Sequence, residues 1–395
     1  MYVKRILSYT LKKAINQFPA VLVSGPRQAG KTTFLKNELS DQFRYISFDD
    51  PIERSFAQTD PNGFLKNLNN FPVILDEIQY VPNLLQSIKL DIENRPGCNG
   101  RWLITGSQQL QMLQRVSETL AGKIAFLELY PLGIREIGNW DSKPLKNIIW
   151  EGGYPDLTLQ PEKRELWLRS YMQSYVERYV RQLQNIRDLR PFEQFVAMAC
   201  ARHGKEFNSA RFSRETGISL PTAKAWANIL EASYLAYFLP PYFDSMGKRT
   251  IKSPKLYMAD PAIACYLTRQ PSSSAAISGA MSQVLFEGLV VMETVKAFTN
   301  RGLKPAAWYW RSHDGLEIDL LIQLQGKLIP IEIKPTATPT ATDLEALARF
   351  RKLAGNERCE PGLLVCCIDG QEQLSYGVTA ISWRNFPEWL GGLLN

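Results

Sequence analysis

The stretch VLVSGPRQAGKTTFL, residues 21–35, decides the fold of the N-terminal part of the chain. It matches the pattern G-x-x-x-x-G-K-[ST], in which an apolar strand passes through a loop into a helix. The glycines let backbone N–H groups converge on phosphate oxygens, and the helix offers its positive N-terminal end. We therefore expect a nucleotide phosphate site formed by Gly25, Pro26, Arg27, Gln28, Ala29, Gly30, Lys31, Thr32 and Thr33.

A second part of the same site is expected on the apolar run VILDEIQ, residues 73–79. Lys31 would reach the β- and γ-phosphates, while the Thr32 hydroxyl and the Asp76 carboxylate would hold Mg²⁺. The adjacent Glu77 would polarise the attacking water as general base. Together these residues predict a site that binds ATP with Mg²⁺ and hydrolyses it.

A third apolar run, LITGSQQ at residues 103–109, ends in polar residues. In such sheets this strand lies between the two strands already described and beside the γ-phosphate. Thr105, Ser107 or Gln108 would then sense the nucleotide. An ordinary polar transition from strand to loop explains any one of them equally well.

Two cations that follow this strand are candidates for a role on a neighbouring subunit. Arg115 or Lys123 would stabilise the transition-state charge on the ATP of an adjacent copy, which requires a homo-oligomer. Lysine lacks the planar fork of arginine, so Lys123 suits this role less well. For either residue alone, a solvated surface cation is the simpler explanation.

The size and composition of the chain limit the possible classes of protein. Its 395 residues allow two or three domains, and a net charge of +7 permits acidic partners such as nucleic acid. The six cysteines make no C-x-x-C pair, and two histidines make a zinc site unexpected. The first residues lack a signal-peptide core, and no run is long enough to cross a membrane. We expect a cytoplasmic protein without a membrane partner.

The segment from 208 to 235 reads as a helix, a turn at Gly217 and a second helix. A short glycine turn between two helices is typical of a helix-turn-helix, and the strand-like runs after it suit a wing. Such a surface contacts the DNA backbone, or else serves packing or protein contact. The basic residues expected on this surface are Lys224 on the second helix, with Lys248, Arg249 and Lys252 at the wing tip.

Near the C-terminus, two neighbouring strand-like runs carry spaced charged residues. Asp319 lies on the first run, and Glu332 and Lys334 share one face of the second because strand side chains alternate. With Glu287 on a preceding helix, this set resembles the core of PD-(D/E)xK nucleases. The resemblance implies that Asp319 and Glu332 bind Mg²⁺, that Glu287 contributes from outside and that Lys334 positions or deprotonates water. Domains of this fold also bind nucleic acid or act as scaffolds without cutting.

Nearly the whole chain resembles a large prokaryotic family of AAA-type ATPases with a C-terminal region of unknown function. The resemblance rests on SGPRQAGKTT, VILDEIQYVPNLLQSIK, LITGS, EGGYPD and SPKLYMADPAIACYL, among other runs. It implies a parallel-sheet ATPase domain, a winged helix and a nuclease-like domain. Two positions depart from the family pattern, which usually has Arg at Lys123 and commonly has Asp at Tyr179.

The fold class expected from these observations is α/β, with three successive parts. A P-loop AAA-type parallel sheet would be followed by a helical and winged-helix region and then by a nuclease-like α/β domain. The expected function is ATP hydrolysis coupled to action on DNA. The alternative is a nucleotide-switched regulatory protein that binds other proteins and carries a non-cutting nuclease-like scaffold. The expected boundaries are 1–149 for the ATPase domain, 150–190 for a helical connector, 191–270 for the winged helix and 280–395 for the nuclease-like domain.

Overall fold

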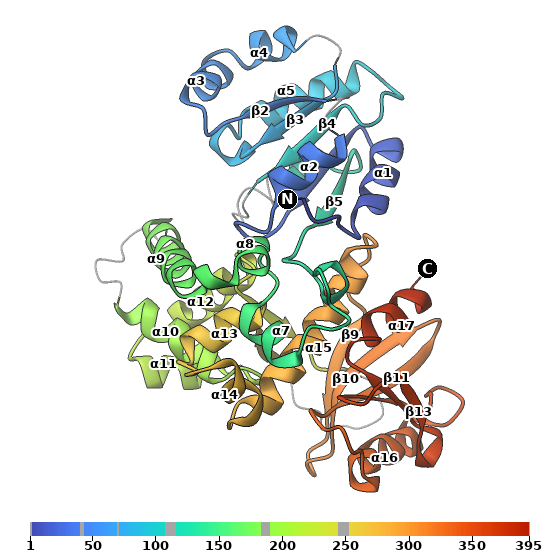
Figure 1. The fold of residues 1–395 in the computed structure, drawn as a ribbon. Coiled ribbons are helices and arrows are strands. Elements are labelled where there is room, and N and C mark those ends of the chain that lie inside the picture. The colour runs from blue at the N-terminus through green and yellow to red at the C-terminus, as the bar shows by residue number, and fades with distance from the viewer. Residues whose placement is uncertain are drawn as a thin grey trace. The chain divides into compact units, whose positions relative to one another are not determined.

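The computed structural model describes residues 2–39, 43–68, 71–106, 116–182, 190–243 and 253–394 (Figure 1). The chain forms two compact units. Unit 1 comprises Met1–Leu132 with Thr299–Lys304, and unit 2 comprises Gly133–Phe298 with Pro305–Asn395. The connector, winged-helix and nuclease-like segments expected from the sequence therefore belong mainly to one compact unit, which also contains residues 133–149 of the expected ATPase domain.

Unit 1 is built on a five-stranded sheet in the order β2-β3-β4-β1-β5. All its strand pairs are parallel, which confirms the parallel sheet predicted from the alternating strands and helices. The strand that ends at Thr105 lies between the other two site strands, as predicted. The strands are β1 (Ala20–Ser24), β2 (Arg44–Ser47), β3 (Val73–Asp76), β4 (Trp102–Thr105) and β5 (Ile124–Glu128).

Helices cover both faces of this sheet because its strands are apolar on both sides (Figure 1). On one face, Leu22 and Leu75 pack with side chains from α3, α4 and α5. On the other, Val21 and Ile74 pack with side chains from α1 and α2. Burial on both faces is what a parallel sheet requires. The helices are α1 (Ser8–Gln17), α2 (Lys31–Leu39), α3 (Pro51–Thr59), α4 (Pro61–Asn67) and α5 (Leu84–Glu93).

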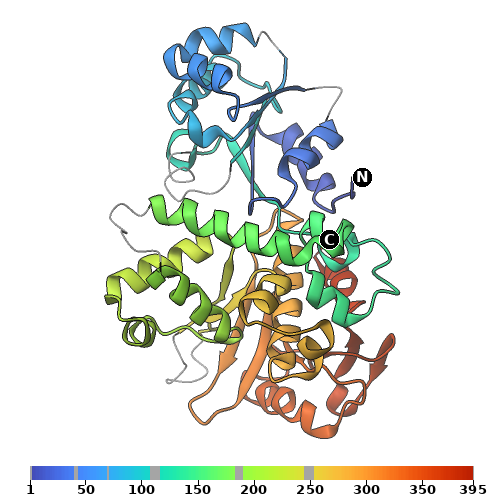
Figure 2. The same cartoon turned by 60° about the vertical axis from the view of Figure 1, so that its left-hand side comes forward.

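The first half of unit 2 combines helices with a small antiparallel sheet in the order β6-β8-β7. The long helix α9 contacts α10 and α13 (Figure 2). The turn between α11 and α12 contains Gly217 in the left-handed region, with φ 70°. The elements are α7 (Leu145–Glu151), α8 (Pro155–Leu159), α9 (Arg164–Gln182), α10 (Arg190–Ala201), β6 (Lys205–Glu206), α11 (Ser209–Thr216), α12 (Leu220–Ala232), β7 (Ala236–Leu239), β8 (Lys255–Met258), α13 (Pro261–Leu267) and α14 (Ser273–Ser278).

The second half of unit 2 contains a six-stranded mixed sheet in the order β13-β14-β12-β11-β10-β9. β9, β10 and β11 pair antiparallel, whereas β11, β12 and β14 pair parallel. α16 covers one face through Leu347 and Phe350. The elements are α15 (Ser282–Thr299), β9 (Ala307–Arg311), β10 (Glu317–Leu324), β11 (Lys327–Ile333), α16 (Glu345–Ala354), β12 (Leu363–Cys366), β13 (Gln371–Gln373), β14 (Thr379–Ser382) and α17 (Phe386–Leu393).

Within the ranges that the structure describes, no helix combines the length and the apolar character needed to cross a bilayer.

Candidate functional site

The loop between β1 and α2 has a backbone that only glycine can adopt at two points. Gly25 has φ +147°, and a Cβ there would lie 2.2 Å from the carbonyl oxygen of Leu129. Gly30 has φ +90°, and Gln28 between them has φ 60°. This geometry turns the loop so that α2 begins at Lys31. Backbone N–H groups at such a turn and helix start form an anion-binding concavity.

Lys31 is folded over this loop and is 7% exposed. Its Nζ donates to the carbonyl oxygens of Gly25, at 3.0 Å, and Pro26, at 2.9 Å. The ammonium group therefore lies at the loop where the sequence places the nucleotide phosphates. Of the other predicted loop residues, Pro26 and Ala29 are buried and Thr32 is half-buried, while Arg27, Gln28 and Thr33 are exposed.

Asp76, at the end of β3, is the point where the site strands meet. Thr32 Oγ1 donates to Asp76 Oδ2 at 2.8 Å, and Thr105 Oγ1 donates to Asp76 Oδ1. The Tyr45 hydroxyl, from β2, also donates to Oδ2, at 2.7 Å. Asp76 is 4% exposed, so three hydroxyl groups satisfy a carboxylate that water scarcely reaches. The structure thus brings Thr32, Asp76 and Thr105 together.

Tyr45 was not found by sequence reasoning, because nothing in its own run distinguishes it from a sheet tyrosine. Burial and the hydrogen bond to Asp76 raise the pKa of its hydroxyl, so the group stays protonated and remains a donor. The ammonium of Lys36, on α2, lies 3.6 Å from the centre of its ring. These contacts fix the phenol beside the predicted Mg²⁺ ligands.

Glu77 follows Asp76 in a left-handed conformation, with φ 60° and ψ 45°. A non-glycine residue in this region is uncommon and is a feature of functional sites. Its backbone N–H donates to Thr105 Oγ1 at 3.4 Å, and Gln79 Nε2 donates to its carboxylate. Glu77 is therefore placed next to Asp76 and Thr105. The contact between Gln79 and Glu77 was not predicted from the sequence.

The oxygen atoms of this site fit the ion that the sequence predicted. Thr32 supplies a hydroxyl and Asp76 a carboxylate, and Mg²⁺ prefers such hard oxygen ligands. The ion would neutralise part of the phosphate charge when it is bound with nucleotide. Ser107, Gln108 and Arg115, which the sequence also proposed for this site, lie outside the described residues.

Arg5 is a buried residue of the site that the sequence did not reveal. It is 5% exposed, and its guanidinium donates to Ala29 O at 3.0 Å and to Tyr130 O at 2.5 Å. It thus ties the phosphate loop to the segment after β5. Elsewhere in unit 1, Lys123 pairs with Glu93 at 2.6 Å on the surface of the same chain. The homo-oligomer and its trans-acting cation stay predictions.

In unit 2 the structure brings together the residues predicted as a nuclease-like set. Lys334 Nζ lies 3.1 Å from Glu332 Oε2 and 3.6 Å from Asp319 Oδ2. Asp319 Oδ2 also accepts a hydrogen bond from the backbone N–H of Ile333 at 3.0 Å. Glu287, on α15, is 4% exposed, and its charge interacts with that of Asp319.

Two residues from β8 enter this set, and sequence reasoning missed both. Lys255 Nζ lies 2.9 Å from Glu287 Oε1 and 2.5 Å from Glu317 Oε1. The hydroxyl of Tyr257 donates to the same oxygen of Glu287. Because β8 precedes α15 in a different predicted domain, no local spacing linked these residues. We call Glu287, Glu317, Asp319, Glu332, Lys255 and Lys334 the acid cluster.

The electrostatics of the acid cluster follow from burial and from mutual repulsion of its carboxylates. Burial and the charge of Asp319 raise the pKa of Glu287, and the same two causes raise that of Glu332 well above its ordinary value. Burial acts to lower the pKa of Lys334, but Asp319 and Glu332 outweigh it and the pKa is raised. The pKa of Lys255 is raised as well, although burial acts to lower it, so both lysines stay charged among the carboxylates.

The acid cluster does not fit a divalent cation as it is arranged. Across the described ranges, no group of three or more His, Cys, Asp or Glu side chains is placed to hold a metal ion. Lysine ammonium groups lie between the carboxylates that were expected to bind Mg²⁺, namely Glu287, Asp319 and Glu332. Lys334, expected to act on water, is paired with two of those carboxylates.

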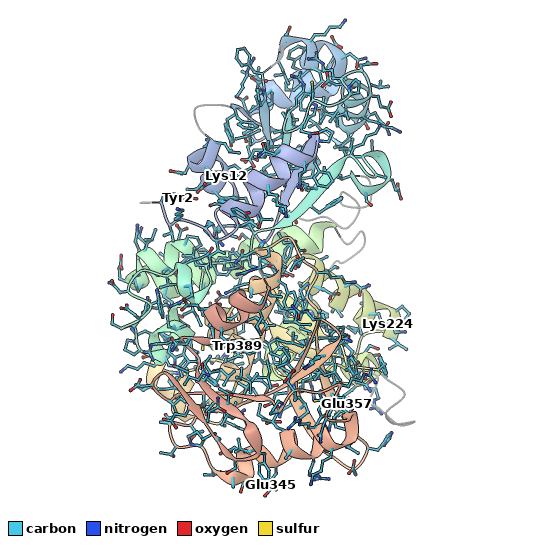
Figure 3. The ribbon with its side chains drawn as sticks, turned by 90° about the vertical axis from the view of Figure 1, so that its right-hand side faces the viewer. Tyr2, Lys12, Lys224, Glu345, Glu357 and Trp389 are labelled. Atoms are coloured by element: carbon cyan, nitrogen blue, oxygen red, sulfur yellow. The ribbon has the colours of Figure 1, made fainter. Side chains whose placement is uncertain are left out.

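The predicted DNA-facing residues are only partly described. Lys224 is exposed on α12 (Figure 3). Tyr179 belongs to α9, and its side chain is outside the described part. The wing-tip residues Lys248, Arg249 and Lys252 also lie outside the described residues.

Family models match the chain in three consecutive segments. Residues 17–138 match an AAA domain, in agreement with the phosphate loop and the parallel sheet. Residues 142–274 and 284–386 match two domains of unknown function, DUF8612 and DUF4143. The N-terminal match supports an AAA-type, ATPase-like domain, and the other two assign no activity.

The similar proteins are distant. Uncharacterized proteins of Mycobacterium bovis and Mycobacterium tuberculosis are each 28% identical over 341 residues, 85% of this chain and 75% of theirs. The Walker-type ATPase of Pyrococcus abyssi has a TM-score of 0.45 and 14% identity, over 67% of this chain and 96% of that one. A Thermotoga maritima RuvB variant has a TM-score of 0.29 and 18% identity, over 60% and 89%.

Proposed function

We propose that the chain hydrolyses ATP at the carboxyl ends of β1, β3 and β4 and uses the energy to act on DNA. The proposal rests on the hydrogen bonds that Asp76 accepts from two other elements. One comes from Thr32, at the phosphate loop, and one from Thr105, on β4, the strand between β1 and β3. A buried carboxylate held by hydroxyl groups from separate elements is pre-organised for Mg²⁺ beside phosphate. The AAA-domain match over residues 17–138 agrees with this reading.

In the proposed reaction each residue has a separate role. The N–H groups of the loop and Lys31 bind the phosphates, and the lysine exchanges its carbonyl contacts for phosphate oxygens. Glu77 accepts a proton from the attacking water, and Gln79 orients its carboxylate. Thr105 contacts both Asp76 and the backbone of Glu77, so it can transmit the state of the γ-phosphate between them.

Action on DNA is supported by the elements of unit 2. α11, the Gly217 turn and α12, followed by β7 and β8, have the order of a winged helix. Lys224 is exposed on the second helix, where such domains contact DNA. The surrounding sequence carries more Lys and Arg than Asp and Glu. Exposed Lys and Arg side chains bind the phosphate backbone through counterion release.

A protein partner is the second candidate, and the exposed face of α12 favours it. Apart from Lys224, this face presents Pro221, Ala225, Asn228 and Glu231, and Leu220 is 39% exposed. A face with one cation, one carboxylate and several uncharged side chains suits a protein contact better than a phosphate backbone. In this alternative, nucleotide state would switch the binding of another protein.

The salt dependence of DNA affinity distinguishes DNA from another protein as the partner. If DNA is the partner, log K falls steeply with log salt, and Lys224→Ala reduces that slope by roughly 1. Lys327→Ala is the matched control, because Lys327 is also an exposed lysine but lies on β11, paired with Glu360. Equal slopes for Lys224→Ala and the control would remove α12 from the DNA surface. Absence of DNA binding at low salt would favour the protein partner.

A further inference from the structure

The acid cluster of unit 2 is a mixed network of carboxylates and cations. At its centre lies Lys255, which comes from β8 of the three-stranded sheet. It is 4% exposed, and its ammonium lies between Glu287, on α15, and Glu317, on β10. A buried ammonium is costly unless its charge and its hydrogen bonds are satisfied. Here two carboxylates satisfy it from two different elements.

Lys334 closes the other half of the cluster. It bridges Glu332 and Asp319, and Asp319 additionally accepts the backbone N–H of Ile333. A divalent cation needs about six oxygen ligands at roughly 2.0–2.6 Å. In this cluster one oxygen each of Glu287, Asp319 and Glu332 already faces an ammonium or N–H group, and that positive charge repels a second cation.

The network also joins the two sheets of unit 2. The isolated bridge between Pro241 and Tyr309 connects the end of β7 to β9, and the Tyr309 hydroxyl donates to Ser253 O. Arg311, on β9, pairs with Glu206, on β6, at 2.9 Å and with Glu317 at 3.4 Å. The ion pairs therefore run from the three-stranded sheet through Lys255 to the six-stranded sheet.

We propose that the acid cluster is an ion network in which Lys255 and Lys334 neutralise the carboxylates and exclude divalent cations. Through Lys255 the network also attaches β8 to α15 and β10. Lys255 supplies the positive charge that a metal ion would supply to the same carboxylates. The C-terminal domain then serves as a scaffold for the three-stranded sheet and performs no metal-dependent cleavage. This inference does not depend on the ATP site, so each can fail without the other.

The first test is a Mn²⁺ titration of the full chain without nucleotide, compared with Asp319→Asn. We expect identical binding curves, because the wild-type cluster takes up no Mn²⁺. Binding that is present in the wild type and lost in Asp319→Asn would overturn the proposal. This arm uses the native protein and does not depend on the folding of a lysine variant.

The second test measures how far Lys255 supports the fold. Lys255→Met leaves Glu287 and Glu317 without their shared cation, so its melting temperature should fall by about 10 °C. Adding Glu287→Gln to Lys255→Met should restore part of the loss, because it removes one of the stranded charges. Lys327→Met, at an exposed ion pair, is the control. If Lys255→Met has the same melting temperature as this control, the proposal that Lys255 attaches β8 to α15 and β10 is wrong.

Discussion

Asp76 shows how one buried side chain organises the proposed nucleotide site. Its two carboxylate oxygens receive hydroxyl groups from Thr32, Tyr45 and Thr105, which belong to three different elements. Each such hydrogen bond contributes about 1 kcal/mol, and more when the acceptor is charged. The larger effect is geometric, since the carboxylate is fixed before any nucleotide arrives. Pre-organisation of this kind is what lowers a reaction barrier.

At the same scale, we predict that His203 makes the stability of the chain depend on pH. It is 2% exposed; its Nδ1 accepts the backbone N–H of Met258 at 2.9 Å, and its ring packs edge-on to Tyr257. Burial lowers the pKa of this histidine from 6.5 to about 4. The folded chain therefore binds fewer protons than the unfolded chain between these values. Stability from this residue is present above pH 6.5 and falls as the pH drops toward 4, by about 3 kcal/mol.

The measurement is urea unfolding of wild type and His203→Asn across this pH range. Asparagine keeps an acceptor near the Nδ1 position but does not titrate, so the variant should lose that part of the pH dependence. His313 is exposed, and His313→Asn is the control because the chain has only two histidines. Parallel pH curves for wild type and His203→Asn would contradict the assignment.

The residues of the nucleotide site were predictable to the extent that they belong to one local pattern. Thr32 and Asp76 were expected because the motifs place Thr32 where β1 passes into α2 and Asp76 at the end of β3, at the same edge of the sheet. Tyr45 and Arg5 were not expected, because each reaches the site through contacts with segments that are distant from it in the sequence. Tyr45 faces Asp76 only since β2 pairs with β3 in a particular register.

At the scale of elements, the turn between α11 and α12 depends on Gly217. Its φ is +70°, and an added Cβ would meet nothing within 4 Å. Gly217→Ala should therefore destabilise unit 2 through backbone strain alone, by about 1 kcal/mol. The midpoint of urea unfolding measures this change, with the slope unaltered.

Gly392, in α17, provides the matched control for this prediction. An added Cβ there also meets nothing within 4 Å, but its backbone is helical. Gly392→Ala should stabilise the chain by up to about 1 kcal/mol, since alanine is the better helix former. The same substitution thus has opposite signs at the two positions. A stabilising Gly217→Ala would mean that the turn does not hold this conformation.

Elements with strong apolar runs were the most predictable. The runs AAWYWRS at 306–312, EIDLLIQL at 317–324 and KLIPIEIK at 327–334 were expected as strands, and they contain β9, β10 and β11. Residues 271–279 fall between the expected winged helix and the expected nuclease-like domain, yet they contain α14, where Ser272 caps the helix and Ala276 is buried. The register of β10 against β9 also shifts after Ile318, which simple alternation did not reveal. Both features depend on packing partners that lie far away in the sequence.

At the scale of the whole molecule, the chain separates into two compact units, one of which carries the proposed nucleotide site. The sequence divided unit 2 into a connector, a winged helix and a nuclease-like domain. The acid cluster is one of the contacts that join these segments, because Lys255 places a charge from the small sheet among carboxylates of the large sheet. Such a contact cannot be predicted from spacing, since its partners are distant along the chain.

The central claim is that the edge of the unit 1 sheet hydrolyses ATP, and one measurement tests it most directly. Nucleotide binding and steady-state ATP turnover are compared for wild type, Lys31→Ala and Glu77→Gln, each with Mg²⁺ and with and without DNA. Lys31 contacts phosphate in the ground state, so Lys31→Ala should lose binding. Glu77 acts on water in the transition state, so Glu77→Gln should bind ATP with wild-type affinity and turn over at least about 100-fold more slowly. Turnover by Glu77→Gln equal to that of wild type, or binding unchanged in Lys31→Ala, would contradict the account.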